Sequence, residues 1–150
     1  MTKPLIVPTD FSEHSAAALG WARRLSDSLD APMHCVYVAR EPTMYLGTEF
    51  APGAVPSVED IKISADEGMA KFVAANDLGP DLTTVVLFGT PFVEIVRYAR
   101  DQNALMIVMC THGHSGIKHM LLGSTAEAVV RKSTCPVLTV PSPGVAFELP

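Results

Sequence analysis

The stretch that decides the fold is ALMIVMC at residues 104–110, followed directly by the polar, glycine-bearing segment THGHSG at 111–116. Its seven apolar residues lack the alternation of a half-buried strand, so they indicate a strand covered on both faces, as in a parallel sheet flanked by helices. Four other segments share this apolar character and leave room for helices between them: 5–8, 33–39, 83–88 and 136–140. The sequence therefore predicts five strands of one sheet.

The segments between these strands carry apolar residues at helical spacing. The residues expected to face the sheet are Ala18, Ala22, Leu25 and Leu29; Ile61, Ala65, Met69 and Phe72; Phe92, Ile95 and Ala99; and Ala126, Val129 and Val130. Ser12 is placed to cap the first helix, and Thr90 precedes a proline at the start of the third. Ser124 and Glu127 have the spacing of a capping box at the last helix, and Gly79 with Pro80 is a stop signal for the second.

Strands and helices thus alternate along the chain, and right-handed crossovers place helices on both sides of the sheet. The predicted fold is an open, doubly wound, five-stranded parallel sheet with helices on both faces, a Rossmann-like α/β fold. A length of 150 residues fits one such domain over residues 1–150.

Two segments fall outside this pattern. Residues 41–56 form a loop with three prolines and two glycines, too long to be a mere connector, and we expect a mobile lid or a partner surface. The tail, residues 142–150, is expected to be ragged or to pack on a neighbouring molecule.

Composition excludes several classes of function. The net charge is −5 and the 11 Lys and Arg residues are scattered, so no nucleic-acid partner is expected. The longest apolar run, 104–110, is far below the roughly 20 residues of a membrane span, and residues 1–8 lack the features of a secretory signal. Three cysteines among apolar neighbours read as reduced thiols. We therefore expect a cytoplasmic protein without membrane contact.

Candidate binding residues gather where two strands end. In open α/β sheets ligands bind outside the carboxyl ends of the strands, where the strand order reverses. Asp10 follows the first strand there, and the segment from Cys110 through His112, Gly113 and Gly116 follows the fourth. Glycines let backbone amides approach an anion closely, and Gly123, Ser124 and Thr125 would stand at a helix N-terminus, which favours phosphate. Together these residues describe a nucleotide cradle, although turn formation by the glycines and helix capping by Asp10 and Ser124 would explain each residue alone.

At this point the chain resembles the universal stress proteins, over nearly its whole length. The segments that carry the resemblance are IVPTDFS at 6–12, GTP at 89–91, THGHSG at 111–116, LLGS at 121–124 and CPVLTV at 135–140. The resemblance implies that ATP or another adenine nucleotide is the ligand, with Mg or Mn left open. It also implies that Asp10 meets the ribose, that Val38 and Met109 border the adenine, and that Gly113, Gly123, Ser124 and Thr125 take the phosphates.

The chain departs from the family pattern at two positions. ATP-holding members show Gly, two residues, Gly, nine residues, Gly and then Ser or Thr, whereas Cys110 stands here at the first glycine and would narrow the space near the ribose. His114 stands where the family usually has Arg or Lys, which predicts weaker and pH-dependent phosphate binding. Family members commonly pair through their last strand, so a homodimer through residues 137–140 is expected.

Two other functions compete with nucleotide binding as a structural or regulatory event in a stress response. A nucleotide-free stress protein acting only through partners would leave the cleft empty. A nucleotidyl-transfer enzyme is suggested by the sequence THGH at 111–114, which resembles a signature of nucleotidylyltransferases, but those enzymes carry it after the first strand. Cys110, His112 and His114 make a poor zinc set. No side chain is obviously placed as a base, so at most slow ATP hydrolysis is expected.

Overall fold

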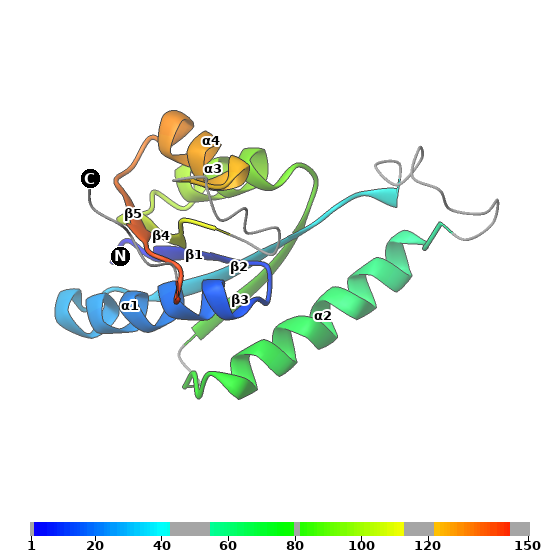
Figure 1. Ribbon diagram of the computed structural model, residues 1–150, viewed down its shortest axis with the longest axis horizontal. Coiled ribbons are helices and arrows are strands. Elements are labelled where there is room, and N and C mark those ends of the chain that lie inside the picture. The colour runs from blue at the N-terminus through cyan, green and yellow to red at the C-terminus, as the bar shows by residue number, and fades with distance from the viewer. Residues whose placement is uncertain (1, 43–54, 80–81, 113–121, 145–150) are drawn as a thin grey trace.

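The computed structural model describes residues 2–42, 55–79, 82–112 and 122–144. Their strands are β1 (Leu5–Thr9), β2 (Met33–Ala39), β3 (Leu82–Phe88), β4 (Met106–Cys110) and β5 (Val137–Val140), and their helices are α1 (Glu13–Leu29), α2 (Val58–Ala75), α3 (Pro91–Asp101) and α4 (Ser124–Lys132) (Figure 1). All pairings are parallel, in the order β3-β2-β1-β4-β5. The predicted fold class is confirmed.

The central strand β1 separates from its neighbour β4 halfway along its length. It pairs with β2 over all five residues but with β4 only at Leu5 and Ile6. The amide of Leu5 donates to the carbonyl of Pro32, just before β2, so the alternation along a strand directs positions 6 and 8 toward β4. Position 8 is Pro8, which has no N–H to donate. A proline is therefore tolerated in this central strand because the pairing with β4 has already ended there.

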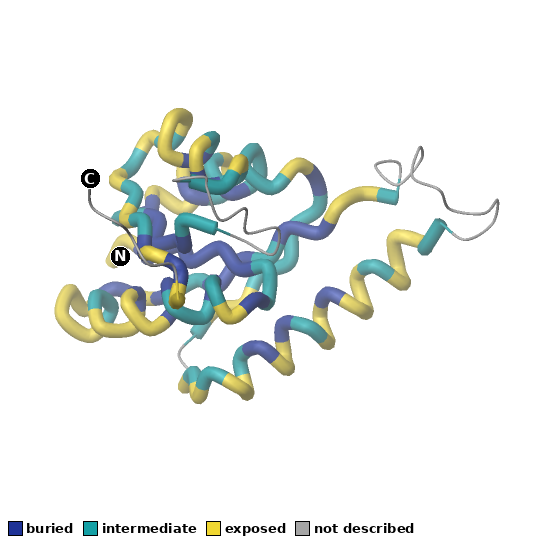
Figure 2. The backbone as a smooth tube through the Cα atoms, in the orientation of Figure 1, coloured by how far each residue is buried: buried dark blue, intermediate teal, exposed yellow. Residues whose placement is uncertain are grey.

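Two apolar layers cover the sheet, one on each face. The layer under α1 and α2 contains Leu5, Val7, Cys35, Val108 and Cys110, whereas the layer under α3 and α4 contains Ile6, Val36, Val38, Ile107 and Met109. The two sets alternate along each strand because successive side chains point to opposite faces. Figure 1 shows α3 and α4 on one side of the strands and α1 and α2 on the other, and Figure 2 shows that the buried residues concentrate in the strands between them.

The helix ends partly follow the predicted signals. Ser12 is the N-cap of α1 and its side chain accepts from the amide of Ser15, as predicted. Thr90 precedes Pro91 at the start of α3, but its side chain makes no capping bond. The prediction that Ser124 caps the last helix is wrong: Gly123 is the N-cap, and Ser124 is the first residue of α4. Since Gly123 has no side chain, that helix starts without a side-chain acceptor.

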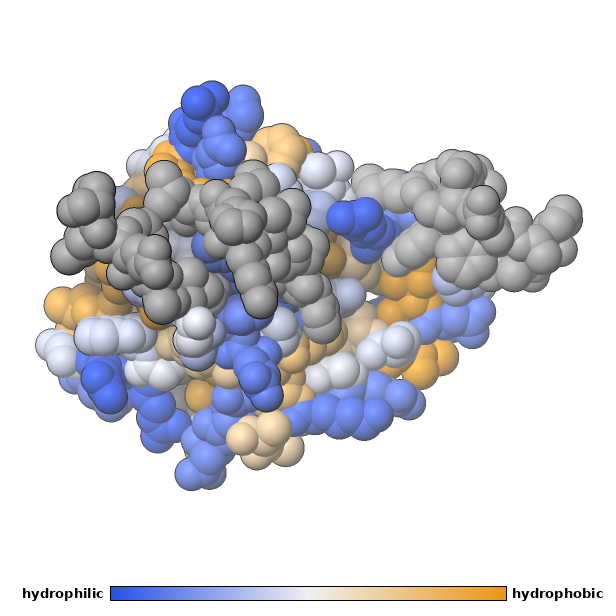
Figure 3. All heavy atoms as spheres, in the orientation of Figure 1, coloured by the Kyte–Doolittle hydropathy of each residue, from blue (hydrophilic) through white to orange (hydrophobic). Residues whose placement is uncertain are grey.

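Five large apolar side chains of the helices are exposed: Trp21, Leu29, Val58, Ile63 and Val130. Leu29 is 47% exposed and Val130 is 44% exposed, although helical periodicity placed both toward the sheet. Leu29 is the last residue of α1, whereas Val130 follows the fully buried Val129 and lies at the margin of the buried face of α4. Trp21 is 50% exposed, with the Arg24 guanidinium 5.2 Å from its ring centre. The remaining surface of α1 and α2, along the lower rim of the molecule in Figure 3, is largely hydrophilic.

The structure defines both ends of α2, whereas the sequence contains a predicted signal only for its C-terminal end. A capping box joins Ser57 and Asp60 at its start, and the Ser57 side chain lowers the pKa of the Asp60 carboxyl by hydrogen bonding to it. The helix ends at Ala75, before the predicted stop at Gly79.

Most of the long loop, at 43–54, and the tail from residue 145 onward lie outside the described residues, so neither the lid nor the ragged tail is tested.

Three further observations bear on the expectations from composition. β5 lies at one end of the strand order, with Leu138 38% exposed. All three cysteines are free thiols, and burial raises the pKa of Cys35 to about 12. In the described part of the chain, no helix combines the length and the apolar character that crossing a membrane requires.

Candidate functional site

A cleft of about 450 Å³ opens where β1 and β4 part, at the carboxyl ends of the central strands. Its lining comes from the ends of three strands and the starts of three helices: Pro8, Thr9, Asp10, Ser15, Val36, Tyr37, Val38, Arg40, Pro91, Ile95, Met109, Cys110, Thr111, His112, Gly123, Ser124, Thr125 and Ala126. The strand order reverses between β1 and β4, so the cleft lies at the switch point of the sheet.

Most of the site residues expected from the sequence come together here. The cleft is lined by Asp10, Val38, Met109, Cys110, His112, Gly123, Ser124 and Thr125. The other two, Gly113 and Gly116, lie outside the described residues, as does His114. The described set joins segments more than 100 positions apart, since parallel strands deliver their carboxyl ends to one edge of the sheet.

One wall of the cleft is the turn between β1 and α1, and its polar groups are bonded to one another. Asp10 Oδ1 accepts from the Ser12 amide at 3.1 Å and from the Ser12 hydroxyl at 2.5 Å. Below it, the Thr9 and Ser15 hydroxyls are 2.9 Å apart, and the Ser15 hydroxyl donates to the Ser12 carbonyl. Asp10 does not itself cap the helix, because Ser12 is the N-cap, but its carboxylate holds that capping residue and also lines the cleft. This wall therefore presents hydrogen-bond acceptors to the cleft, above all the Asp10 carboxylate.

The opposite wall is the start of α4, and it presents backbone amides as hydrogen-bond donors. Gly123, Ser124, Thr125 and Ala126 all line the cleft, and the N-cap, Gly123, has no side chain that could cap the helix. The first amides of a helix lack intrahelical partners, and the helix dipole makes that end positive. The Gly123 amide itself donates to the carbonyl of Thr111 at 2.6 Å, which ties the start of α4 to the end of β4.

Cys110 lines the cleft, but its thiol has another partner. Its Sγ lies 3.3 Å from the Ser142 hydroxyl, and both residues are buried. The side chain belongs to the apolar layer under α1, on the face of the sheet away from α3 and α4. The cysteine at the position of the family's first glycine is therefore accommodated by a contact with the segment after β5.

His112 stands at the mouth of the loop that follows β4. Its Nδ1 lies 3.0 Å from the Thr111 hydroxyl. The Thr111 amide donates to the Val140 carbonyl of the neighbouring strand, so this pair is anchored at the edge of the sheet. The residue also lines the cleft.

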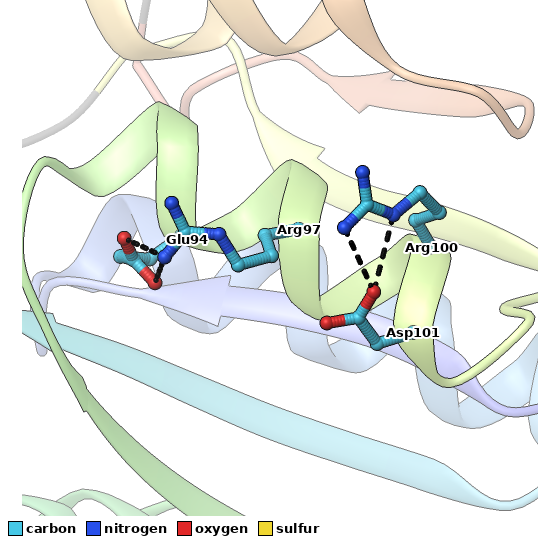
Figure 4. Close-up of polar contacts among 4 residues, drawn as sticks. All are labelled: Glu94, Arg97, Arg100 and Asp101. Atoms are coloured by element: carbon cyan, nitrogen blue, oxygen red, sulfur yellow. Dashed lines mark hydrogen bonds and ion pairs between the residues drawn. The ribbon is translucent and has the colours of Figure 1, made fainter.

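Sequence reasoning missed several cleft residues, among them Arg40 and Tyr37. Both follow from the rule that ligands bind at carboxyl ends, because β2 ends at Ala39 beside β1. Arg40 is the one Lys or Arg among the described residues that line the cleft. Two arginines of α3 are paired on their own helix instead: Arg97 with Glu94 at 2.7 Å and Arg100 with Asp101 at 3.0 Å (Figure 4).

A second hollow, of about 570 Å³, lies at the other end of the sheet. It is lined by the C-terminal part of α1 and the starts of β2 and β3, including Arg23, Asp27, Asp30 and Met33. Although it is larger than the cleft, it holds none of the predicted site residues and lies at the amino ends of the strands. Within the ranges that the structure describes, no three His, Cys, Asp or Glu side chains gather in a way that could hold a metal ion.

The chain is similar to known proteins over nearly its whole length. The model of the universal stress protein family matches residues 1–141. Universal stress protein MJ0531 of Methanocaldococcus jannaschii is 34% identical over 143 residues, which cover 94% of this chain and 83% of the relative. The solved structure of MJ0577, from the same organism, has a TM-score of 0.76 at 30% identity and covers 94% of this chain and 96% of that chain. A universal stress protein solved in complex with cAMP has a TM-score of 0.63 at 25% identity, covering 92% and 96%.

Proposed function

The chain belongs to the universal stress protein family, and from this premise we propose that it binds ATP or another adenine nucleotide in the cleft between β1 and β4, as a structural or regulatory ligand in a stress response. The observation that carries the proposal is the polarity of the cleft. An acceptor wall at Asp10 faces a donor wall at the start of α4. A nucleotide has the matching polarity, because its ribose hydroxyls donate and its phosphates accept.

The phosphates are assigned to the start of α4. A phosphate at a helix N-terminus is stabilised by unpaired amides and by the helix dipole. Gly123, Ser124 and Thr125 supply that terminus, and the family resemblance adds Gly113 and Gly116 from the preceding loop. Arg40, at the end of β2, adds a positive charge to the lining of a cleft in a chain whose net charge is −5.

The nucleoside is assigned to the strand ends. Val38 and Met109 are buried residues on the same face of the sheet, and both line the cleft, which suits an apolar, flat base. Asp10, directly after β1, is the acceptor for the ribose. A volume of about 450 Å³ lies within the range of roughly 300–1,000 Å³ typical of small-molecule sites. The cAMP complex of a relative 25% identical to this chain supports an adenine nucleotide as the ligand class.

The cleft residues bind and orient in this proposal, and turnover is slow or absent. The carboxylate of Asp10 holds a ribose hydroxyl, and the α4 amides neutralise phosphate charge. Pairing of two copies through β5 is part of the proposal, because β5 is the last strand in the order of the described sheet, Leu138 is 38% exposed, and a free strand edge favours association.

The test begins with the purified protein. It is denatured with acid, and the supernatant is analysed for adenine nucleotides. Titration calorimetry then measures the affinity of the protein for ATP, AMP and cAMP, with GTP as control, in the presence of EDTA, Mg or Mn. Retention or micromolar binding of an adenine nucleotide supports the proposal. An empty protein that binds none of them overturns it in favour of action through partners alone, and release of pyrophosphate would point to nucleotidyl transfer.

A further inference from the structure

The backbone at Phe11, between Asp10 and Ser12, has an unusual conformation. Its φ is 65°, in the left-handed region that side chains rarely adopt. Three other described non-glycine residues have positive φ, namely Asp30, Asp77 and Asn103. Those are short polar residues just after helices, where this conformation is common. A bulky aromatic residue in the same region persists only where its surroundings hold it there.

The surroundings of Phe11 are an aromatic cluster joining β2 and α2. The Phe11 ring stacks on Tyr37 with centroids 4.3 Å apart and an interplanar angle of 24°, and it meets Phe72 of α2 at 5.9 Å. The Phe11 amide donates to the Thr9 hydroxyl at 2.9 Å. Both the ring and the backbone of this residue are therefore fixed.

Gly68 of α2 makes room for the ring. A Cβ atom added at Gly68 would lie 2.7 Å from Cε2 of Phe11, closer than real Cβ contacts. Any larger residue at this position must push the Phe11 ring out of its place. By contrast, a Cβ added at Gly20, on the solvent side of α1, would meet nothing within 4 Å.

We infer that Phe11 is a positioning residue of the nucleotide cleft, held by Tyr37 and by the gap at Gly68, and that it fixes the Asp10 carboxylate for the ribose. The inference rests on the proposed function. Asp10 and Ser12 flank Phe11 directly, and their mutual hydrogen bonds span the turn whose geometry Phe11 sets. A displaced ring would rotate the turn and carry the carboxylate away from the cleft.

A consequence is that α2 takes part in binding without lining the site. None of its residues, all of which the structure describes, borders the cleft. The helix nevertheless lies along β2 and β3 and reaches well beyond the strands (Figure 1). Through Gly68 and Phe72 it contacts the residue that orients Asp10.

The experiment compares Gly68→Ala with Gly20→Ala, since both replace a helical glycine by alanine and gain the same helix propensity. Titration calorimetry measures ATP and 2′,3′-dideoxy-ATP, which lacks the ribose hydroxyls. For Gly68→Ala we expect at least a fivefold weaker affinity for ATP and less than a twofold change for dideoxy-ATP. Gly20→Ala should bind both ligands as the unmodified protein does, and thermal unfolding monitors the fold of each variant.

The outcomes separate the inference from the proposed function. If the unmodified protein binds neither ligand, the function fails and the inference with it. If it binds ATP but Gly68→Ala loses nothing, or loses ATP and dideoxy-ATP equally, Phe11 does not act through the ribose contact and only the inference is overturned. Should Gly68→Ala not fold, Phe72→Leu replaces it, with an expected twofold loss confined to ATP.

Discussion

The two helices that begin at opposite walls of the cleft start in opposite ways. α1 is capped by Ser12, which is bonded to Asp10 and Ser15, so its polar groups are satisfied within the protein. α4 starts at Gly123, which has no side chain to cap the helix and whose amide donates to the Thr111 carbonyl. One wall is thus closed by side chains of the protein, whereas in the proposed function the N-terminal amides of α4 at the other wall receive the phosphates.

The difference shows how the carboxyl ends of one sheet can present hydrogen-bond acceptors on one side of a cleft and donors on the other. In the unfolded chain both segments are short runs with Ser, Thr and an acidic residue nearby, and the second one also contains Gly123. After folding, one of them contributes a fixed carboxylate and the other a positive helix end. This arrangement matches an elongated ligand with hydrogen-bond donors at one end and negative charge at the other.

Giving α4 a side-chain N-cap like that of α1 should have the largest effect on ATP affinity. Gly123→Asp supplies a cap and a negative charge at the donor wall, and like charges about 4 Å apart near a protein surface repel by up to about 4 kcal/mol. We expect ATP affinity to fall by about two orders of magnitude in titration calorimetry. The midpoint of thermal unfolding should not fall, because Asp is a good N-cap.

The matched control is Gly123→Asn, which caps without the charge and should weaken ATP binding less. Equal affinity of the unmodified protein and Gly123→Asp would show that the phosphates lie elsewhere.

Removing a single donor from α4 should have an intermediate effect. Ser124→Pro deletes one amide hydrogen at the first helical position, where proline is tolerated and where Pro91 already stands in α3. Gly123 has the extended backbone, φ −67° and ψ 159°, that a following proline requires. A hydrogen bond to a charged group contributes about 1.5 kcal/mol or more, so ATP affinity should drop about tenfold in calorimetry.

Ser124→Ala keeps the amide and removes only the hydroxyl. If this variant loses as much affinity as Ser124→Pro, the hydroxyl rather than the amide is the donor.

Uncapping α1 should affect stability. Ser12→Ala removes the N-cap and the hydroxyl that donates to Asp10, which should cost about 1 kcal/mol of unfolding free energy in urea titrations. For a chain of this length, that lowers the thermal midpoint by about 3 °C. Ser28→Ala, on the exposed side of the same helix, serves as control and should stay within about 0.5 kcal/mol of the unmodified protein. A Ser12→Ala variant as stable as Ser28→Ala would show that the cap contributes nothing.

The smallest effect concerns pH and the attachment of α3 to β2. His34 Nδ1 lies 3.0 Å from the Tyr98 hydroxyl, and burial lowers the pKa of His34 below its usual 6.5. The folded state therefore prefers neutral His34, and the unfolded state takes up the proton first as pH falls. This contribution to stability is complete above about pH 6.5 and declines below it.

Urea midpoints at pH 7.5 and 5.5 measure this decline. The difference between the two midpoints should shrink in His34→Phe and persist in Tyr98→Phe. An unchanged difference in His34→Phe would assign the pH dependence to other groups.

Much of the architecture followed from local patterns. The continuous apolar runs placed all five strands within two residues of their observed bounds, because strands buried on both faces have no polar positions. Periodicity failed at Leu29 and Val130, since it reports which face of a helix is apolar but not where that face ends: Leu29 closes α1, and Val130 lies beside the buried Val129. At α4, Ser124 was a plausible cap by spacing, but the bond from the Gly123 amide to Thr111 sets the start of the helix one residue earlier than that motif requires.

The site was only partly within reach of the sequence. Asp10, Gly123 and the residues near them were found because the carboxyl ends of parallel strands meet at one edge. Arg40 and Tyr37 were missed although the same rule covers β2. The role of Gly68 could not be inferred, because an isolated glycine in a helical pattern does not reveal which ring, 57 positions away in the chain, occupies the space above it.

The alternation of strands and helices, the two covered faces of the sheet and the family could all be predicted from the sequence alone. These features depend on local periodicity and on motifs of contiguous residues. The folded structure alone shows that β1 leaves β4 after Ile6, that the Cys110 thiol lies against the Ser142 hydroxyl, and that Phe11 has a left-handed backbone and packs against α2. Each of these depends on the distance between atoms that are remote in the chain, and close packing, which no local pattern encodes, fixes those distances.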